Sequence, residues 1–329
     1  MGVNLGGLIG PLVTGALWGW KGFHWGFAAA ALGMALGLAQ YLLLRRGTIG
    51  DIGNRASNPL RKAEAPRYLL FAGVGVAAIV IAGLMGWLQA ERLAGIVVMV
   101  TLVATVALFA VILSSKKITE AKRSRVVSFI PMFIASATFW SLFQQQFTII
   151  VVYADQRLNR DVFGFEISPA WVNSINPIFI VIFAGVFAAM WTKLGDRQPS
   201  TPLKFAAGTF IMGVAFLLFI PYAGGGANST PLMWIVLILF LFTLAELFLS
   251  PVGQSLATKL APEAFKTQMI ALFFLSVAVG SAMAGVLKRW YTEETEVAYS
   301  LAVGGGSILV AVVMVLLNKW IVKKMAGVR

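Results

Sequence analysis

Hydrophobic residues along this chain are grouped into ten long runs that short polar segments separate. Each run is about 18–25 residues long, which is the length with which an α-helix crosses a hydrocarbon core of roughly 30 Å. The runs lie near residues 3–20, 25–44, 68–88, 94–114, 127–152, 170–191, 203–222, 232–253, 268–287 and 299–322. This pattern predicts an all-α polytopic membrane protein with ten transmembrane helices in a lipid bilayer.

The composition excludes an ordinary soluble domain. Hydrophobic residues make up 59% of the chain and charged residues 12%, whereas soluble domains are about half apolar and about a quarter charged. The chain has no cysteine, so neither a disulfide nor redox chemistry is expected.

The net charge of +13 is compatible with nucleic-acid binding, but the basic residues follow a membrane pattern. When the chain is threaded through ten spans, most of its 26 lysines and arginines fall on one side. Their loops lie near 45–67, 114–125, 193–204 and 259–266, together with the C-terminal end. The positive-inside rule then predicts a membrane protein with a cytoplasmic C-terminus, and no nucleic-acid partner is expected.

One acidic residue, Glu246, lies in the middle of a predicted span. An ionised carboxylate at the bilayer centre costs about 2.5–3.5 kcal/mol, so it must face protein or a water-filled cavity. Thr243 and Ser250 share its helix face, and Pro251 is expected to kink the helix. A helix–helix salt bridge or hydrogen bond is the structural alternative, and a binding cavity is the favoured interpretation.

The sixth run carries Asn173 and Asn176, three residues apart, and Asn176 directly precedes Pro177. A second kinked helix is therefore expected there. A buried amide without a partner costs about 1–3 kcal/mol. Both an interhelical hydrogen bond and a ligand contact remain open for these asparagines.

The fifth run contains Trp140, Gln144 and Thr148 at positions i, i+4 and i+8, which predicts one polar stripe on a continuous helix. Three consecutive glutamines at 144–146 place an amide on almost every face. At least one of them is expected to point into a polar cavity. Taken alone, Trp140 is interpreted as ordinary core packing.

Small residues spaced four positions apart predict two seams at which membrane helices pack closely. One is formed by Gly2, Gly6 and Gly10, and the other by Ser276, Gly280 and Ala284.

No enzyme signature is recognisable. His24 is the sole histidine, and no cluster of histidine, cysteine and carboxylate has metal-ligand spacing. The glycine triplets at 224–226 and 304–306 lack the strand–turn–helix context of a phosphate loop. Neither catalytic residues nor a metal or other cofactor are expected.

Several of these polar segments resemble motifs of the proton-dependent oligopeptide transporter family, within the major facilitator superfamily. They are, in order, MGVNLGGLIGPL, FWSLFQQQ, NSINPIFI, AELFLSPVG and KLAPEAF. Gly195, Asp196 and Arg197 look like the cytoplasmic turn of the superfamily. The resemblance implies a major facilitator fold that lacks its first four helices.

The resemblance also divides the chain into three parts. Residues 1–44 correspond to the last two helices of the N-terminal bundle. Residues 45–125 form basic linkers and an inserted transmembrane hairpin, and residues 126–329 form the C-terminal six-helix bundle. The substrate-binding residues that it implies are Asn4, Trp140, Gln144, Asn176, Glu246, Ser250 and Phe273. Asn176 and Glu246 are expected to hold the amino terminus of a peptide.

The function implied by this resemblance is proton-coupled symport of di- and tripeptides by alternating access. Gln144 stands where many members carry a glutamate, and the acidic motif of the family's first helix is absent here. Glu246 is therefore the candidate for proton coupling, and the chain is expected to be a partial copy that does not transport alone. The alternatives are another major-facilitator carrier and a non-transporting membrane remnant or scaffold.

Overall fold

The computed structural model describes residues 2–51, 61 and 63–328. Arg55, Lys62 and Arg329, which belong to the predicted basic side, lie outside the described residues. The long helices are α1 Gly2–Lys21, α2 Phe23–Thr48, α3 Ala65–Leu84, α4 Ala90–Ser114, α5 Glu120–Phe143, α7 Ile175–Leu194, α8 Thr201–Leu217, α9 Leu232–Leu260, α10 Lys266–Leu287 and α11 Glu296–Lys324. All ten predicted runs therefore correspond to helices.

Nine helical segments in the described part of the chain are long and apolar enough to cross a membrane. The helix α1 is not among them, because Asn4, Pro11, Lys21 and several glycines interrupt its apolar sequence. The predicted all-α, multi-pass architecture is confirmed. The strands are confined to a two-residue hairpin, β1 Asp161–Val162 and β2 Phe165–Glu166.

Contacts group the chain into two units: residues 1–15 with 94–329, and residues 16–93. The three-part division inferred from the sequence stays a prediction. In the smaller unit, α3 buries none of its residues, as a helix surrounded by lipid would. Lys21 Nζ lies 4.3 Å from the ring centroid of Trp20 and 4.8 Å from that of Trp25. This cation–aromatic cluster is typical of a membrane–water interface.

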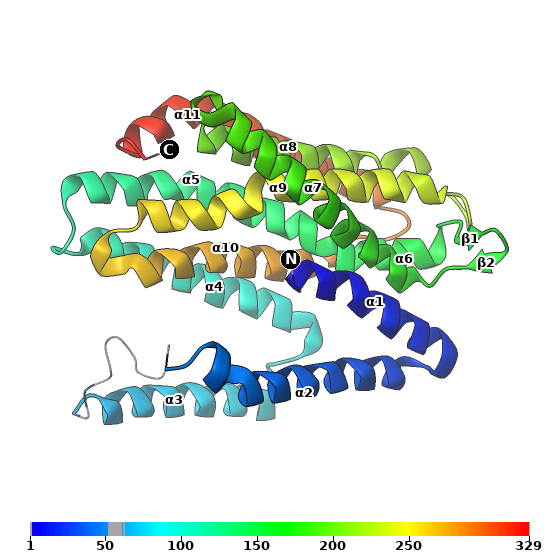
Figure 1. Cartoon of the computed structure of the whole chain (residues 1–329), viewed down its shortest axis with the longest axis horizontal. Helices are drawn as coiled ribbons and strands as arrows, with labels where there is room; N and C mark the ends of the chain where they lie inside the picture. The colour runs from blue at the N-terminus through cyan, green and yellow to red at the C-terminus, as the bar shows by residue number, and fades with distance from the viewer. Residues whose placement is uncertain (1, 52–60, 62, 329) are drawn as a thin grey trace. The chain divides into compact units, whose positions relative to one another are not determined.

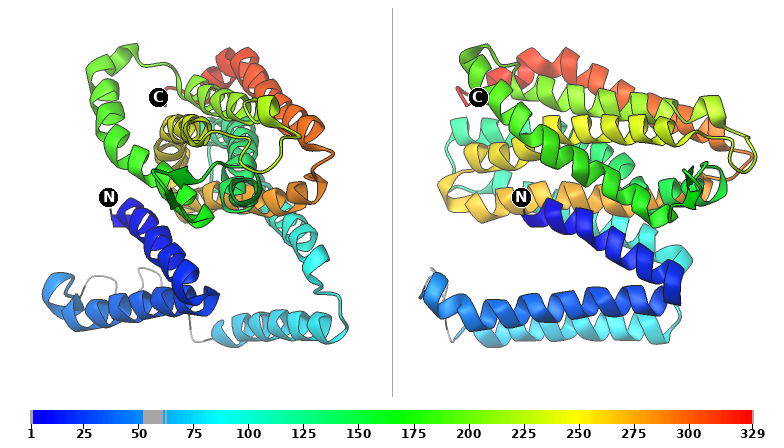
Figure 2. Two further views of the ribbon diagram at one scale, coloured as in Figure 1. Left: turned by 90° about the vertical axis from the view of Figure 1, so that its right-hand side faces the viewer. Right: turned by 45° about the vertical axis from the view of Figure 1, so that its right-hand side comes forward.

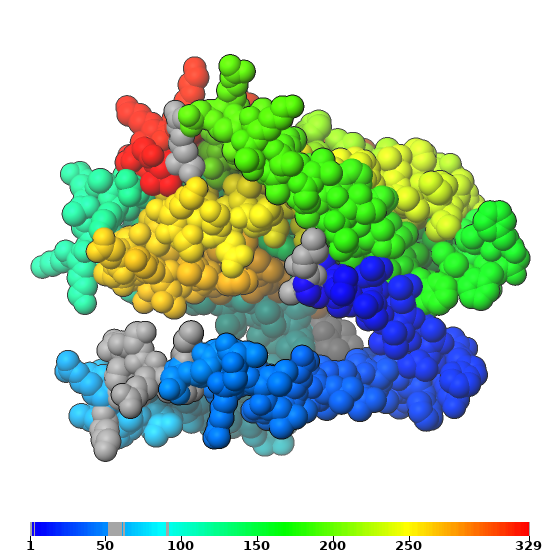
Figure 3. Space-filling view, viewed as in Figure 1, coloured from blue at the N-terminus to red at the C-terminus, as the bar shows by residue number. Residues whose placement is uncertain are grey.

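The larger unit contains a helix bundle in which α5, α8, α9, α10 and α11 lie side by side (Figures 1 and 2). Phe129, Phe139, Phe216 and Phe242 are fully or almost fully buried in its core. The helix α7 packs against α9, and these two helices form much of the face seen in Figure 3. The bundle thus brings α7 and α9, which carry Asn176 and Glu246, into contact.

One predicted small-residue seam is confirmed and the other is wrong. A Cβ atom on Gly280 would lie 2.6 Å from Trp140 Cβ, so α5 and α10 approach closely there. Cβ atoms on Gly2, Gly6 or Gly10 would meet nothing within 4 Å in the described structure. The contact face of α1 is shifted instead to Gly7 and Gly15.

The two α1 contacts involve the segment that begins the sixth run. A Cβ on Gly7 would lie 3.3 Å from Pro177 Cγ, and one on Gly15 would lie 2.8 Å from Trp171 Cδ1. Trp171 Nε1 also donates to the Leu12 carbonyl at 3.2 Å. The first half of α1 is therefore held against the start of α7.

The prediction of a continuous fifth helix is wrong. The helix α5 ends at Phe143, a 3-10 segment η1 spans Gln144–Phe147, and a short helix α6 runs over Ile149–Gln156. Gln145 Nε2 donates to the Ser141 carbonyl at 3.1 Å, so a side chain competes for the backbone acceptors of the helix end. Trp140, Gln144 and Thr148 consequently do not form one helical stripe.

The sixth run also differs from the prediction of a kinked helix. A 3-10 segment η2 spans Pro169–Ser174 and includes Asn173, and α7 begins only at Ile175. Pro177 is thus the third residue of α7. It does not kink a continuous helix, because the first N–H groups of a helix lack intrahelical acceptors anyway. Pro251, in contrast, lies inside α9 as predicted.

Candidate functional site

The predicted polar residues of α7 and α9 meet directly. Asn176 Nδ2 donates to Thr243 Oγ1 at 3.0 Å and to Glu246 Oε2 at 3.4 Å. Thr243 Oγ1 in turn donates to the Leu239 carbonyl at 2.9 Å. Asn176 is 6% exposed to solvent, and Thr243 is fully buried. An interhelical hydrogen bond, one of the two interpretations left open for Asn176, is therefore present.

Glu246 makes the interhelical hydrogen bond that was one form of its structural alternative, but it does not make the other form, a salt bridge. Within the described part of the chain, no ion pair joins its carboxylate to a lysine or arginine. The long hydrogen bond from Asn176 satisfies one of its two oxygens. Because a carboxylate can accept about four hydrogen bonds, most of its capacity remains open for a cationic or donor group.

Ser250 lies on α9 together with Glu246, and Phe273 lies on α10. Ser250 is partly buried, one turn after Glu246 on the same helix face. Phe273 is 4% exposed, and its ring packs so closely on α9 that a Cβ on Gly253 would lie 2.6 Å from its Cε2 atom. The structure places Phe273 in the core between two helices. Its role in a side-chain pocket stays a prediction.

Trp140 and Gln144 form a second group at the end of α5. Gln144 Nε2 donates to Ser281 Oγ of α10 at 2.9 Å. The Trp140 ring makes edge contacts with Phe139 and Phe143 at centroid distances of 5.3 and 5.2 Å. Its indole N–H is buried and has no acceptor in the described structure. Such an unsatisfied donor is unusual in a core and suits a ligand-facing position.

The remaining two glutamines, Gln145 and Gln146, are buried in the bundle. Gln145 Oε1 accepts a hydrogen bond of 2.7 Å from Tyr299 of α11, and Gln145 is fully buried. Gln146 is 2% exposed. Asn4, on the first half of α1, is partly buried.

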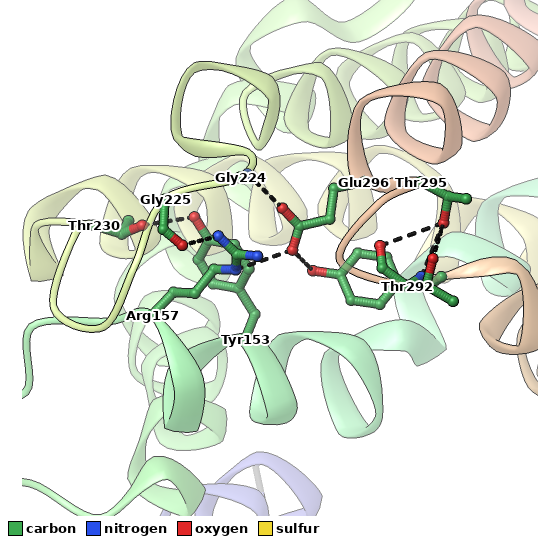
Figure 4. A network of polar contacts seen from close by, with 9 residues as sticks. Tyr153, Arg157, Gly224, Gly225, Thr230, Thr292, Thr295 and Glu296 are labelled. Carbon is green, nitrogen blue, oxygen red and sulfur yellow. Dashed lines mark hydrogen bonds and ion pairs between the residues drawn. The ribbon is translucent and has the colours of Figure 1, made fainter.

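The structure also contains a polar network that the sequence analysis missed (Figure 4). Arg157 Nε lies 3.0 Å from Glu296 Oε1, and both side chains are 6% exposed. Glu296 Oε2 accepts from the Gly224 N–H at 2.9 Å, and Tyr291 donates its hydroxyl to Oε1 at 3.0 Å. Arg157 Nη1 donates to the Gly225 carbonyl. This network joins the end of α6, the α8–α9 loop and the start of α11.

Every charged group in this network has its partners. Burial, followed by the nearby Glu296 carboxylate, raises the pKa of Tyr291, so its phenol stays protonated and donates. The network was missed because Arg157 and Glu296 are separated in sequence and each lies at the end of an apolar run. The only sequence signal for their contact was that the predicted ten-span arrangement puts both residues on the same side of the membrane.

Comparison with known proteins identifies the family of this fold. The sequence pattern of the POT family matches residues 1–304. The chain belongs to the POT family. The predicted resemblance is therefore confirmed, and the chain is a member of a family of membrane transporters rather than enzymes.

Individual POT relatives agree with this assignment. The chain is 38% identical to the uncharacterized transporter YclF of Bacillus subtilis, covering 100% of this chain and 67% of the relative. It is 33% identical to the di-/tripeptide transporter of Lactococcus lactis subsp. cremoris, covering 100% of this chain and 68% of the relative. A crystal structure of a peptide transporter POT in complex with sulfate is 40% identical, with a TM-score of 0.92 over 99% of this chain and 68% of that one.

Proposed function

We propose that this POT-family chain takes part in proton-coupled symport of di- and tripeptides by alternating access. The observation that carries the proposal is the Glu246 carboxylate, which lies within a membrane-spanning helix beside Asn176 and has no basic partner in the described structure. The name of the Lactococcus relative supports peptides as the substrate class.

A peptide ammonium fits this arrangement chemically. Charge-assisted hydrogen bonds are roughly twice as strong as neutral ones, and they gain further strength where water is excluded. Glu246 supplies the charge, while the Asn176 amide orients the carboxylate through its Nδ2 donor. Trp140 and Phe273 would contribute apolar contacts to peptide side chains, and Gln144 and Ser250 would contribute polar contacts. Asn4 would contact the peptide from α1.

We also propose Glu246 as the proton-coupling residue. An ionised carboxylate in a membrane interior is costly without a cationic partner, and Glu246 is a titratable group within a described span beside the candidate peptide site. The bacterial sources of its relatives support a bacterial plasma-membrane location, and the distribution of basic residues supports a cytoplasmic C-terminus.

Dipeptide binding to the purified chain tests this proposal. Ala-Ala should bind to the native chain, and N-acetyl-Ala-Ala should compete poorly because it has no ammonium. Glu246→Gln should weaken Ala-Ala binding, whereas Glu263→Gln, which changes a carboxylate that is 84% exposed, should not. Equal competition by both peptides would refute an ammonium-binding role for Glu246.

The pH dependence of the same binding tests proton coupling. If Glu246 couples proton and peptide in symport, affinity for Ala-Ala should rise as Glu246 takes up its proton at lower pH, because linkage requires the two ligands to favour each other. A fall at lower pH would show competition for one carboxylate and would leave Glu246 as an ammonium site without a coupling role. The profile of Glu246→Gln should be flat over the same range. A native profile that persists in this variant would assign proton coupling to another residue.

A further inference from the structure

A cavity at the end of the bundle that carries the C-terminus lies away from the candidate peptide site. It has a volume of about 420 Å³, and its lining includes Asp196, Gln198, Thr201, Lys204, Lys259 and Met325. These residues come from the α7–α8 turn, the start of α8, the last turn of α9 and the end of α11. The turn itself requires glycine, because Gly195 has a φ of +48°.

The buried ammonium of Lys204 is the unusual feature of this cavity. Lys204 is 9% exposed, and its Nζ donates to Gln198 Oε1 at 2.6 Å and lies 4.2 Å from the Trp191 ring centroid. Both partners are uncharged. Within the described residues no ion pair joins Lys204 to a carboxylate, including that of Asp196 on the exposed rim. A buried charge normally requires a counter-ion.

Two further features raise the positive potential in the same place. Lys259 lines the same cavity, so a second ammonium faces it. Lys204 also lies in the first turn of α8, where the helix dipole is positive and disfavours a cation. An anion in the cavity would offset the buried Lys204 charge and the helix dipole together.

We infer that this cavity binds the phosphate group of an anionic phospholipid. The phosphate would lie between Lys204 and Lys259 at the start of α8, because helix N-termini and lysines both bind phosphate oxygens. Val322, Met325 and Val328 form an apolar wall, against which the glycerol and acyl part of a lipid would pack. Basic pockets between membrane helices on the cytoplasmic side are suited to such headgroups. Free phosphate carries the same charge, but it has no apolar part that could pack against this wall.

Thermal unfolding of the full chain in detergent tests this inference, with phosphatidylglycerol, phosphatidylcholine or inorganic phosphate added. Phosphatidylglycerol should raise the melting temperature of the native chain above the value in phosphatidylcholine. In Lys204→Gln and Lys259→Gln its apparent affinity should fall about tenfold or more, as loss of a charge-assisted contact predicts. Lys193→Gln, which removes an exposed lysine outside the cavity, is the matched control and should respond like the native chain.

Each outcome of this experiment decides the question. Stabilisation by inorganic phosphate with the same pattern across the variants would keep the phosphate site and make free phosphate its source. Equal stabilisation of all four proteins by phosphatidylglycerol, or no advantage over phosphatidylcholine, would overturn the inference. If Lys204→Gln does not fold, Lys259→Gln gives the answer, because Lys259 is exposed and its replacement perturbs no core.

Discussion

Glu246 and Glu296 are both carboxylates held against neighbouring helices, but their surroundings are opposite. Glu296 contacts Arg157, Tyr291 and the Gly224 N–H, so both of its oxygens have close partners. Glu246 receives one long hydrogen bond, from Asn176. A carboxylate whose partners are all supplied by the protein serves the fold, whereas one with open capacity is available to a ligand.

Breaking the saturated pair should have the largest effect on stability. Arg157→Ala leaves the Glu296 charge buried without its cation, which should lower the free energy of unfolding by about 3–5 kcal/mol. Chemical or thermal unfolding in detergent measures this loss. Lys122→Ala breaks a pair whose Glu263 partner is 84% exposed, and it should cost about 1 kcal/mol or less. Similar losses in the two variants would contradict the structural role of Arg157.

Replacing each glutamate by glutamine should separate binding from stability. Glu246→Gln should weaken Ala-Ala binding by about 10- to 100-fold, the loss expected for a charged hydrogen bond, with little change in unfolding. Glu296→Gln should do the reverse. Parallel measurements of affinity and melting temperature on both variants check this, and a stability loss in Glu246→Gln as large as in Glu296→Gln would remove the distinction.

Gln145 and Gln144, at the end of α5, allow the same comparison between a buried and a more open hydrogen bond for uncharged groups. Tyr299→Phe removes the donor to Gln145 Oε1 inside a fully buried site, so unfolding should be favoured by about 1–3 kcal/mol. Tyr68→Phe, at a tyrosine that is 54% exposed, is the control and should be near neutral. The unfolding free energies of the two variants in detergent provide the comparison.

The smallest effect is expected at Ser281. Ser281→Ala removes the acceptor for Gln144, a partly buried contact between membrane helices, and such bonds contribute about 0.6 kcal/mol on average. The same unfolding assay measures it. A loss greater than that of Tyr299→Phe would show that the end of α5 depends on Gln144 rather than on Gln145.

The sequence was sufficient to predict the membrane helices and the centre of the candidate site. Hydrocarbon thickness imposes a length on each span, so the apolar runs match the helices, with boundaries shifted by a few residues. Glu246 and Asn176 stood out because polar groups inside apolar runs are costly. The seam at Gly280 was also predictable, because small residues at this spacing let membrane helices pack closely.

Other features depend on partners that local patterns do not specify. The end of α5 at Phe143 is accompanied by the Gln145 side chain, which donates to the Ser141 carbonyl and accepts from Tyr299 on a helix distant in sequence. The ion pair of Arg157 and Glu296 joins residues that each look like an ordinary loop charge. The start of α7 at Ile175 follows from its 3-10 neighbour, so the Asn-Pro sequence alone gave the wrong geometry.

The separation of Arg157 and Glu296 along the chain has a consequence for biogenesis. The glutamate is synthesised roughly 140 residues after the arginine, which at about 5–20 residues per second is on the order of ten seconds. During that delay the nascent arginine has no counter-ion and must wait at the membrane surface in contact with water. Its position at the very end of α6 permits this, so this end of the bundle can close only when α11 has entered the bilayer.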